Sequence, residues 1–156
     1  MNESIENRRS IRKYQDAPVS RELLEEVLRA GNLAPSAKNW QPWRFVVATG
    51  RGKAEAVAAM RRGLAREAET PLLPGSAQHR QGAAYTAQIM EQAPAVIFAI
   101  NPLGTDVRAP LSPEERVYEI CNAQSLGAAL ENMALRATEL GLGSLWICDT
   151  YFAYDE

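Results

Sequence analysis

Apolar residues recur at the spacing of an α-helix in several stretches of the chain. The clearest stretch begins after Ser20, a residue that can cap a helix, and continues to Gly31, a residue that can end one. A second amphipathic stretch covers residues 53–69, where apolar side chains face inward and arginines form a solvated face. Shorter helices are predicted over residues 2–8 and 83–92.

The longest helical pattern begins at Ser112. Ser112 is followed by Pro113 and Glu115, which is the form of a capping box with proline at the first helical position. The apolar stripe then continues to Leu140, roughly 42 Å at 1.5 Å per residue. Gly127 allows either a break or the close approach of another helix. Helices of this length and apolarity often form the spine of an intertwined dimer, which we take as a hypothesis.

Continuous apolar runs predict the strands. Residues 45–48 form one run and residues 95–100 another, and the second, apolar on both faces, is typical of a central strand covered by helices. Gly141 and Gly143 stop the long helix, residues 144–148 predict a third strand, and no further strand follows. Residues 71–82 predict a mobile connection that holds the only histidine, which we leave out of the site.

Composition sets the class of protein. The 156 residues fit one domain, and 46% hydrophobic with 23% charged residues is typical of globular proteins. The net charge of −2 gives no general attraction to nucleic acid or anionic lipid. No apolar run is long enough to span a membrane and no signal peptide is visible, so we expect a cytoplasmic protein. The two cysteines lack the spacing of a zinc site or a disulfide framework.

The stretch from Ala34 to Trp43 has the composition of a shaped loop. Two prolines forbid a regular helix, amide side chains offer hydrogen bonds, and two tryptophans give the stretch something to bury. A loop of this kind seated on a strand suits hydrogen bonding to a flat polar ligand. The alternative is a well-packed connection in which Trp40 and Trp43 only fill the core.

A basic segment precedes the first long helix. Four of the six residues from Arg8 to Lys13 are cationic, although the whole chain is slightly acidic. Arginine binds phosphate oxygens with two parallel hydrogen bonds, and Ser10 adds a hydroxyl, so the segment suits an anion such as a nucleotide monophosphate. A solvated basic arm is the alternative, but Ile11 and Tyr14 give the segment something to bury.

Together these stretches resemble the FMN-dependent nitroreductase family. The matching segments are RRSIRKY at 8–14, APSAKNWQPWRFVV at 34–47 and ALENMALRATELGLGSLW at 129–146, in the family's order. The resemblance implies one α+β domain over residues 1–156, with a central, mostly antiparallel sheet flanked by helices. It also implies an intertwined homodimer with FMN at the subunit interface. The family's usual C-terminal strand extension, and the basic residues that complete its phosphate site, are not in this sequence.

Matching positions imply which residues of this chain would contact FMN. Arg8, Arg9 and Ser10 correspond to contacts with the phosphate and ribityl chain. Arg12 corresponds to a cation near the N1 and O2 edge of the flavin ring, where it would stabilise the negative charge of the reduced flavin.

Two further stretches carry implied contacts. The loop that the partner subunit would lay along the flavin contributes Pro35, Ser36, Ala37 and Asn39, with Gln41 as a further candidate. The stretch whose backbone would lie against the other flavin face, with an amide donor to N5 from one of its last two residues, is Trp146, Ile147, Cys148 and Asp149. Ser125 matches a position that sometimes contacts the flavin. Trp146 is larger than the residue common there and would narrow the pocket.

The implied activity is that of an oxidoreductase with a ping-pong cycle. NAD(P)H gives a hydride to FMN, and an electron-poor small molecule such as a nitroaromatic or a quinone then takes it. Because the flavin carries the chemistry, no catalytic side chain and no metal site is expected. The alternatives are a specialised flavin chemistry, such as flavin fragmentation or dehalogenation, and a protein that binds or stores FMN without turnover. One short basic cluster argues against nucleic acid as a partner.

Overall fold

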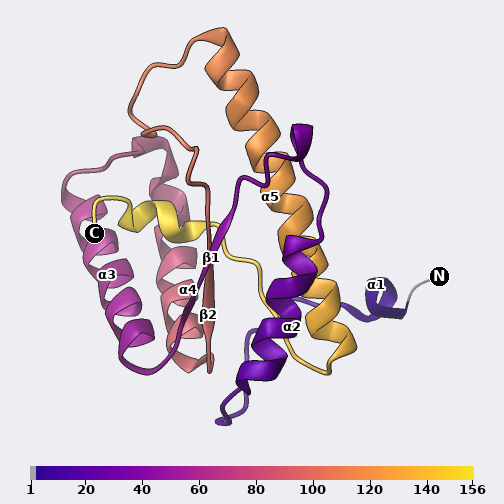
Figure 1. Cartoon of the computed structure of the whole chain (residues 1–156). Helices are drawn as coiled ribbons and strands as arrows, with labels where there is room; N and C mark the ends of the chain where they lie inside the picture. The colour runs from indigo at the N-terminus through magenta and orange to yellow at the C-terminus, as the bar shows by residue number, and fades with distance from the viewer. Residues whose placement is uncertain (1–2) are drawn as a thin grey trace. The chain divides into compact units, whose positions relative to one another are not determined.

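A computed structural model describes residues 3–156, so Asn2, where the first predicted helix begins, lies outside the described residues. Helices dominate these residues, and β1 and β2 form a small antiparallel sheet (Figure 1). This confirms the predicted α+β class. In chain order the elements, with η marking a 3-10 turn, are α1 (Glu3–Asn7), α2 (Arg21–Asn32), η1 (Ala37–Asn39), β1 (Arg44–Ala48), α3 (Gly50–Glu69), η2 (Pro74–His79), α4 (Arg80–Gln92), β2 (Val96–Ile100), α5 (Pro113–Glu139) and η3 (Asp149–Ala153).

The chain divides into two compact units, each with its own core. The first consists of the described residues up to Ser10 together with Val19–Val46 and Ile97–Ser144. The second consists of Ile11–Pro18, Val47–Val96 and Leu145–Glu156. The boundary cuts through both strands, so each unit is described by itself.

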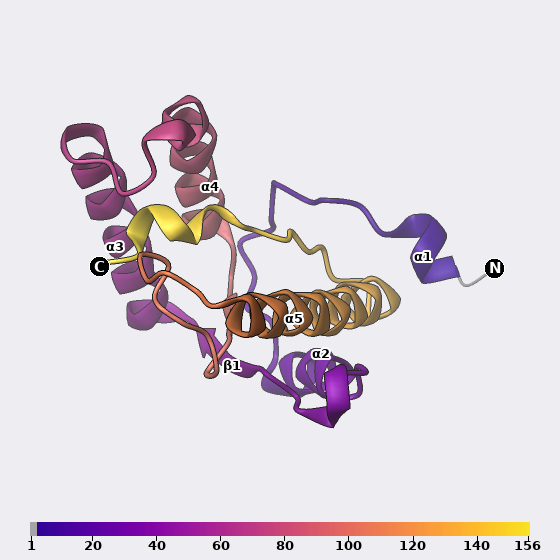
Figure 2. The same cartoon turned by 90° about the horizontal axis from the view of Figure 1, so that it is seen from above.

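In the first unit, α2 packs along α5 (Figures 1 and 2). Val27 of α2 and Met133 and Ala137 of α5 are buried in one apolar cluster. Gly31 is buried beside it, and a Cβ there would lie 2.9 Å from the Met133 side chain and 3.1 Å from Phe45. The prediction that Gly31 ends the helix was therefore wrong: α2 continues through Asn32, and the glycine serves close packing instead. Ser20 caps α2 as predicted, since its hydroxyl accepts a hydrogen bond from the Leu23 N–H.

Helix α5 follows its sequence signals closely. The Ser112 hydroxyl accepts a hydrogen bond from the Glu115 N–H, and the Glu115 carboxylate accepts one from the Ser112 N–H, which confirms the capping box. The helix continues without a break past Gly127. It ends in a Schellman motif, where Gly141 has a φ of 73° and the Leu142 N–H donates to the Ala137 carbonyl at 2.8 Å. No helix within residues 3–156, α5 included, has the length and apolarity needed to cross a membrane.

In the second unit, η3 packs against the pair formed by α3 and α4 (Figure 2). Phe152 is completely buried with Met60, Ala83 and Ala87. Gly63 makes this packing fit: a Cβ on it would overlap the Phe152 carbonyl and lie 2.6 Å from the Ala153 Cα. Helices α3 and α4 each begin three residues earlier than predicted.

Arg66, which was predicted to lie on the solvated face of α3, is partly buried instead. Its guanidinium donates to the Phe152 carbonyl at 3.3 Å and lies 3.5 Å from the Glu156 carboxylate and 3.9 Å from that of Asp155. Arg61 and Arg62 are exposed, as predicted. One arginine of the face therefore fastens the last residues of the chain to α3.

Two strand predictions were wrong. Residues 144–148 do not form a strand, because only Ser144 pairs, in a single parallel bridge with Ser10. Apolar composition favours an extended segment, but a strand also needs a neighbour along its length. The second error concerns β2, which has β1 as its only neighbour within residues 3–156 and is therefore not central. Val46 and Ile100 are accordingly exposed.

Glu67 is a buried carboxylate that the sequence pattern did not reveal. Its two oxygens accept hydrogen bonds from the N–H groups of Leu72 and Leu73, both at 2.9 Å, and so fix the chain where it leaves α3. Burial acts to raise the pKa of Glu67, but these two hydrogen bonds and the neighbouring Arg66 guanidinium outweigh it and hold this pKa below its usual value.

We expect Glu67→Gln to lower the free energy of unfolding at neutral pH by about 1–3 kcal/mol, because an amide can accept only one of the two N–H groups well. The depressed pKa stabilises the fold above the unfolded value of 4.5, and this contribution is lost as the pH falls through the folded value. Urea unfolding of both proteins across this range should show the difference shrinking below about pH 4.5. A difference that stays constant down to pH 3 would contradict the role of the ionised carboxylate.

Candidate functional site

The loop between α2 and β1 contains a cluster of unusual backbone conformations. Lys38, Asn39 and Gln41 have φ angles of 52°, 54° and 49°, all in the left-handed region. A residue with a Cβ pays roughly 1–2 kcal/mol to enter this region, although asparagine tolerates it better than most. Strain of this kind persists only where the surroundings enforce it, and it concentrates at ligand-binding segments.

Side chains of neighbouring elements hold this loop in place. The buried Ser125 hydroxyl of α5 accepts a hydrogen bond from the Ala37 N–H at 3.2 Å and donates one to the Cys121 carbonyl at 2.7 Å. Within the loop, the Ser36 hydroxyl accepts from the Gln41 N–H at 2.9 Å. The hydroxyl of Ser125, a predicted flavin contact, therefore holds the loop and has no hydrogen left to donate to a ligand.

The two tryptophans of the loop have different surroundings. Trp43 is half-buried beside Phe45 and donates from Nε1 to the Asn32 side chain at 3.1 Å. Trp40 is exposed, its ring lies 5.3 Å from that of Tyr118, and the Lys38 ammonium lies 5.4 Å from it. The alternative in which both tryptophans only fill the core is therefore wrong for Trp40.

The loop presents two side-chain amides to solvent. Asn39 and Gln41 are exposed, and neither amide forms a hydrogen bond to any of residues 3–156. Pro35 is exposed as well, while Ser36 and Ala37 are partly buried. Two flat donor–acceptor groups on a strained and well-anchored backbone are suited to the polar edge of a planar ligand.

The first residue of the basic segment, Arg8, contacts α5. The Arg8 Nε is 3.6 Å from the Glu131 carboxylate, and Ser10 is bridged to Ser144. Arg9 is exposed, and one terminal nitrogen of its guanidinium donates to the carbonyls of Glu6 and Arg8 at 2.7 and 2.8 Å. The other N–H groups of Arg9 make no bond within residues 3–156.

The basic segment and the loop meet α5 at different places. The loop is tied to Ser125 and the basic segment to Glu131, so their attachment points are roughly 9 Å apart along the axis. At 3.6 residues per turn they also differ by about 120° around it. The loop and Arg8 therefore approach different sides of the same helix.

The remaining predicted site residues belong to the second unit. Arg12 is exposed, near a Tyr14 whose pKa is raised by burial and lowered in smaller part by the Arg12 charge. Trp146 and Cys148 are exposed, and Ile147 and Asp149 are partly buried.

Thr86 is a polar residue that the sequence reasoning missed. It lies on the buried face of α4, and its hydroxyl donates to the Asp149 carboxylate at 2.7 Å. The available signal was a hydroxyl on a stripe that is otherwise apolar, formed by Ala83, Ala87 and Met90.

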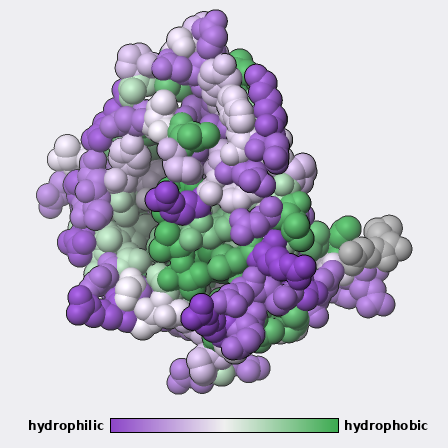
Figure 3. All heavy atoms as spheres, in the orientation of Figure 1, coloured by the Kyte–Doolittle hydropathy of each residue, from purple (hydrophilic) through white to green (hydrophobic). Residues whose placement is uncertain are grey.

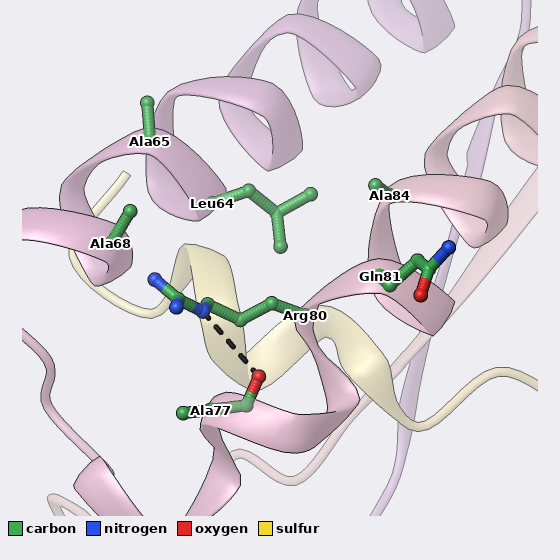
Figure 4. Close-up of a pocket in the computed structure, with 7 residues that line it drawn as sticks. All are labelled: Leu64, Ala65, Ala68, Ala77, Arg80, Gln81 and Ala84. Carbon is green, nitrogen blue, oxygen red and sulfur yellow. Dashed lines mark hydrogen bonds between the residues drawn. The ribbon is translucent and has the colours of Figure 1, made fainter.

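A shallow groove between α3 and α4 is separate from the predicted site residues. Its volume is about 570 Å³, and most of its lining consists of alanines: Ala65 and Ala68 of α3, Ala84 of α4 and Ala77 of η2. In Figure 4 the Leu64 side chain projects into it, and the Arg80 guanidinium donates to the Ala77 carbonyl at 3.4 Å. None of the predicted site residues lines this groove.

Known proteins with similar sequences share one family. The model of the nitroreductase family matches residues 5–154. A protein of Archaeoglobus fulgidus, provisionally named an NADH dehydrogenase/NAD(P)H nitroreductase, is 31% identical over 144 residues, which are 92% of this chain and 64% of that protein. A protein of Methanothermobacter thermautotrophicus with the same name is 30% identical over 92% of this chain and 58% of its own length. The chain thus spans less than two thirds of these curated relatives.

Solved structures give the same picture for the fold. A BluB-like flavoprotein of Clostridium difficile is 27% identical and superposes with a TM-score of 0.76 over 97% of this chain and 75% of that one. A provisionally named nitroreductase of Desulfovibrio desulfuricans in complex with FMN is 29% identical, with a TM-score of 0.68 over 98% of this chain and 70% of the other. The nitroreductase-like fold predicted from the sequence is therefore confirmed.

Proposed function

Because this chain belongs to the nitroreductase family, we propose that it is an FMN-dependent oxidoreductase that uses NAD(P)H to reduce small electron-poor acceptors such as nitroaromatics or quinones. The names of its relatives and the FMN complex of a similar structure support this proposal. The structural observation that carries it is the strained loop that presents the Asn39 and Gln41 amides.

The chemistry of the donor groups fits FMN. A phosphate needs charge-assisted donors, and Arg9 offers N–H groups that bind nothing else within residues 3–156. The Arg8 pair with Glu131 is long and partly exposed, so it contributes only about 0–1 kcal/mol and can be exchanged for a phosphate at little cost. The exposed amides of the loop suit the pyrimidine edge of the flavin, which has both donors and acceptors.

The residues of this chain would bind and orient the cofactor. Arg8, Arg9 and Ser10 would hold the phosphate end, and the Arg12 charge would favour a negatively charged ring edge. Asn39 and Gln41 would fix the pyrimidine edge, and the stretch from Trp146 to Asp149 would cover one face of the ring. When bound, FMN supplies the redox chemistry, accepting a hydride from NAD(P)H and giving it to the acceptor.

We further propose that the functional form is a homodimer with two FMN sites at the interface. Val117, Tyr118 and Ile120 near the start of α5 are 56%, 45% and 53% exposed, beside the exposed Trp40. Figure 3 shows apolar side chains reaching the surface of the molecule among polar ones. Large apolar side chains grouped on one helix mark a surface that another chain can cover. The different faces of α5 that carry the loop and the basic segment agree with a loop that serves the partner's cofactor.

The double variant Val117→Asp/Ile120→Asp is expected to be monomeric and to bind FMN at least tenfold more weakly, because two buried charges would oppose association. Sedimentation velocity gives the assembly state, and quenching of flavin fluorescence gives the affinity. Tyr85→Asp is the matched control, since Tyr85 is an equally exposed apolar residue on α4. A variant that remains dimeric with unchanged FMN affinity would show that this part of α5 does not lie in the interface.

The proposed activity is tested by titrating the purified chain with FMN and then adding NADH or NADPH without oxygen. We expect flavin absorbance to appear with the protein, to bleach with the reductant and to return when a nitroaromatic or a quinone is added. Bound FMN that neither reductant bleaches would indicate binding without turnover. Protein that takes up no FMN would refute the proposal.

A further inference from the structure

The hydroxyl of Thr86 is placed unusually for its helix. It lies on the face of α4 that contributes Ala83 and Ala87 to the core, and the residue is only 9% exposed. A hydroxyl in such surroundings needs a partner, and its partner is the Asp149 carboxylate at 2.7 Å. A hydrogen bond of this length to a charged acceptor is of the strong, charge-assisted kind.

Two contacts hold the short segment from Asp149 to Phe152, one at each end. The Asp149 side chain is bound by Thr86, and three residues later Phe152 is locked into the core between α3 and α4. The segment before it, by contrast, has no regular structure, and the side chain of Cys148 is exposed. Among residues 3–156, no backbone carbonyl accepts a hydrogen bond from the N–H of Cys148 or of Asp149. The Thr86 contact therefore holds the side chain at the start of η3, next to two peptide N–H groups that donate to no backbone carbonyl among these residues.

We infer that Thr86 is a positioning residue for cofactor binding, and that it acts through the Asp149 carboxylate. It orients the peptide between Cys148 and Asp149 so that an N–H points at the flavin ring. This inference rests on the proposed function, in which the stretch from Trp146 to Asp149 lies against the flavin. The competing explanation is that Thr86 only stabilises the packing of η3 on α4.

The test compares Thr86→Val, which keeps the shape and removes the donor, with Thr86→Ser, which keeps the donor. Thr70→Val is the matched control, because Thr70 is an exposed threonine at the end of α3. Each variant of the 156-residue chain is examined for FMN affinity, for the visible spectrum and midpoint potential of the bound flavin, and for urea unfolding without FMN. Hydrogen–deuterium exchange of residues 145–150 is followed in the FMN-free chain.

We expect Thr86→Val to weaken FMN binding about tenfold, to shift the flavin spectrum and potential, and to speed exchange in residues 145–150. Thr86→Ser should restore the affinity to within about twofold of the wild type, and Thr70→Val should behave as the wild type. In an Asp149→Ala background, Thr86→Val should have no further effect on FMN affinity, because the two residues act as one unit.

Two results would overturn the inference. One is a folded Thr86→Val variant whose FMN affinity, potential and exchange equal those of the wild type. The other is a loss of FMN affinity on Thr86→Val that is equally large in the wild-type chain and in the Asp149→Ala background. Faster exchange in Thr86→Val combined with a wild-type chain that takes up no FMN would instead refute the proposed function and leave the Thr86–Asp149 contact as the support of this segment.

Discussion

Alanine in place of Gly63 is expected to lower the free energy of unfolding by about 3 kcal/mol. The added methyl group would overlap the Phe152 carbonyl and crowd the Ala153 Cα, and both are backbone atoms that cannot rotate away. Either α3 or η3 must move. Because η3 begins at Asp149, the change should also reach the segment proposed to cover the flavin. Urea unfolding followed by far-ultraviolet circular dichroism measures the loss.

The matched control for Gly63 is Gly52→Ala on the same helix. A Cβ at Gly52 would meet no atom within 4 Å, so alanine should stabilise the chain by about 0.5–1 kcal/mol through its better helix propensity. Opposite signs for the two substitutions are the expected signature of close packing at Gly63. Equal effects at both positions would show that η3 does not pack as closely on α3 as described.

Removing the two arginines proposed to bind the phosphate, by Arg8→Gln and Arg9→Gln together, is expected to weaken FMN binding about 100-fold. Each charge-assisted hydrogen bond to a phosphate contributes roughly 1.5–3 kcal/mol, and 1.4 kcal/mol corresponds to a factor of ten. The fold should be little affected, because the Arg8 ion pair is partly exposed. Fluorescence quenching during titration with FMN gives the affinity.

Riboflavin distinguishes a phosphate contact from a general loss of binding. It carries the same ring without the phosphate, so the double variant should bind it as the wild type does. Arg51→Gln is the control for loss of a surface charge, since Arg51 is an exposed residue of α3 paired with Glu55. An equal loss of affinity for FMN and riboflavin would show that the two arginines do not contact the phosphate.

The sequence predicted those features that depend on neighbours along the chain. The caps at Ser20 and Ser112 were correct because a cap needs only the N–H groups two or three residues ahead. The third strand at residues 144–148 was wrong because pairing depends on which segment lies alongside, and only Ser10 does. The burial of Glu67 was not predicted for a similar reason, because it depends on the loop N–H groups that its carboxylate contacts in the fold.

The candidate site shows the same division. The amides of Asn39 and Gln41 and the cations of Arg8 and Arg9 were visible as residue types suited to a nucleotide. The left-handed backbone of the loop was not visible, because lysine and glutamine give no local signal for a positive φ. The Thr86 contact with Asp149 joins residues 63 positions apart, so only the fold could reveal it.

Helix α5 sets the spacing between the loop bound at Ser125 and the Arg8 side chain paired with Glu131. One added residue between Ser125 and Glu131 would turn one attachment point against the other by about 100° and displace it by about 1.5 Å. Substitutions in this interval change only local contacts, whereas insertions or deletions change the phase of everything beyond them. We therefore expect functional relatives of this protein to keep the length of this interval constant.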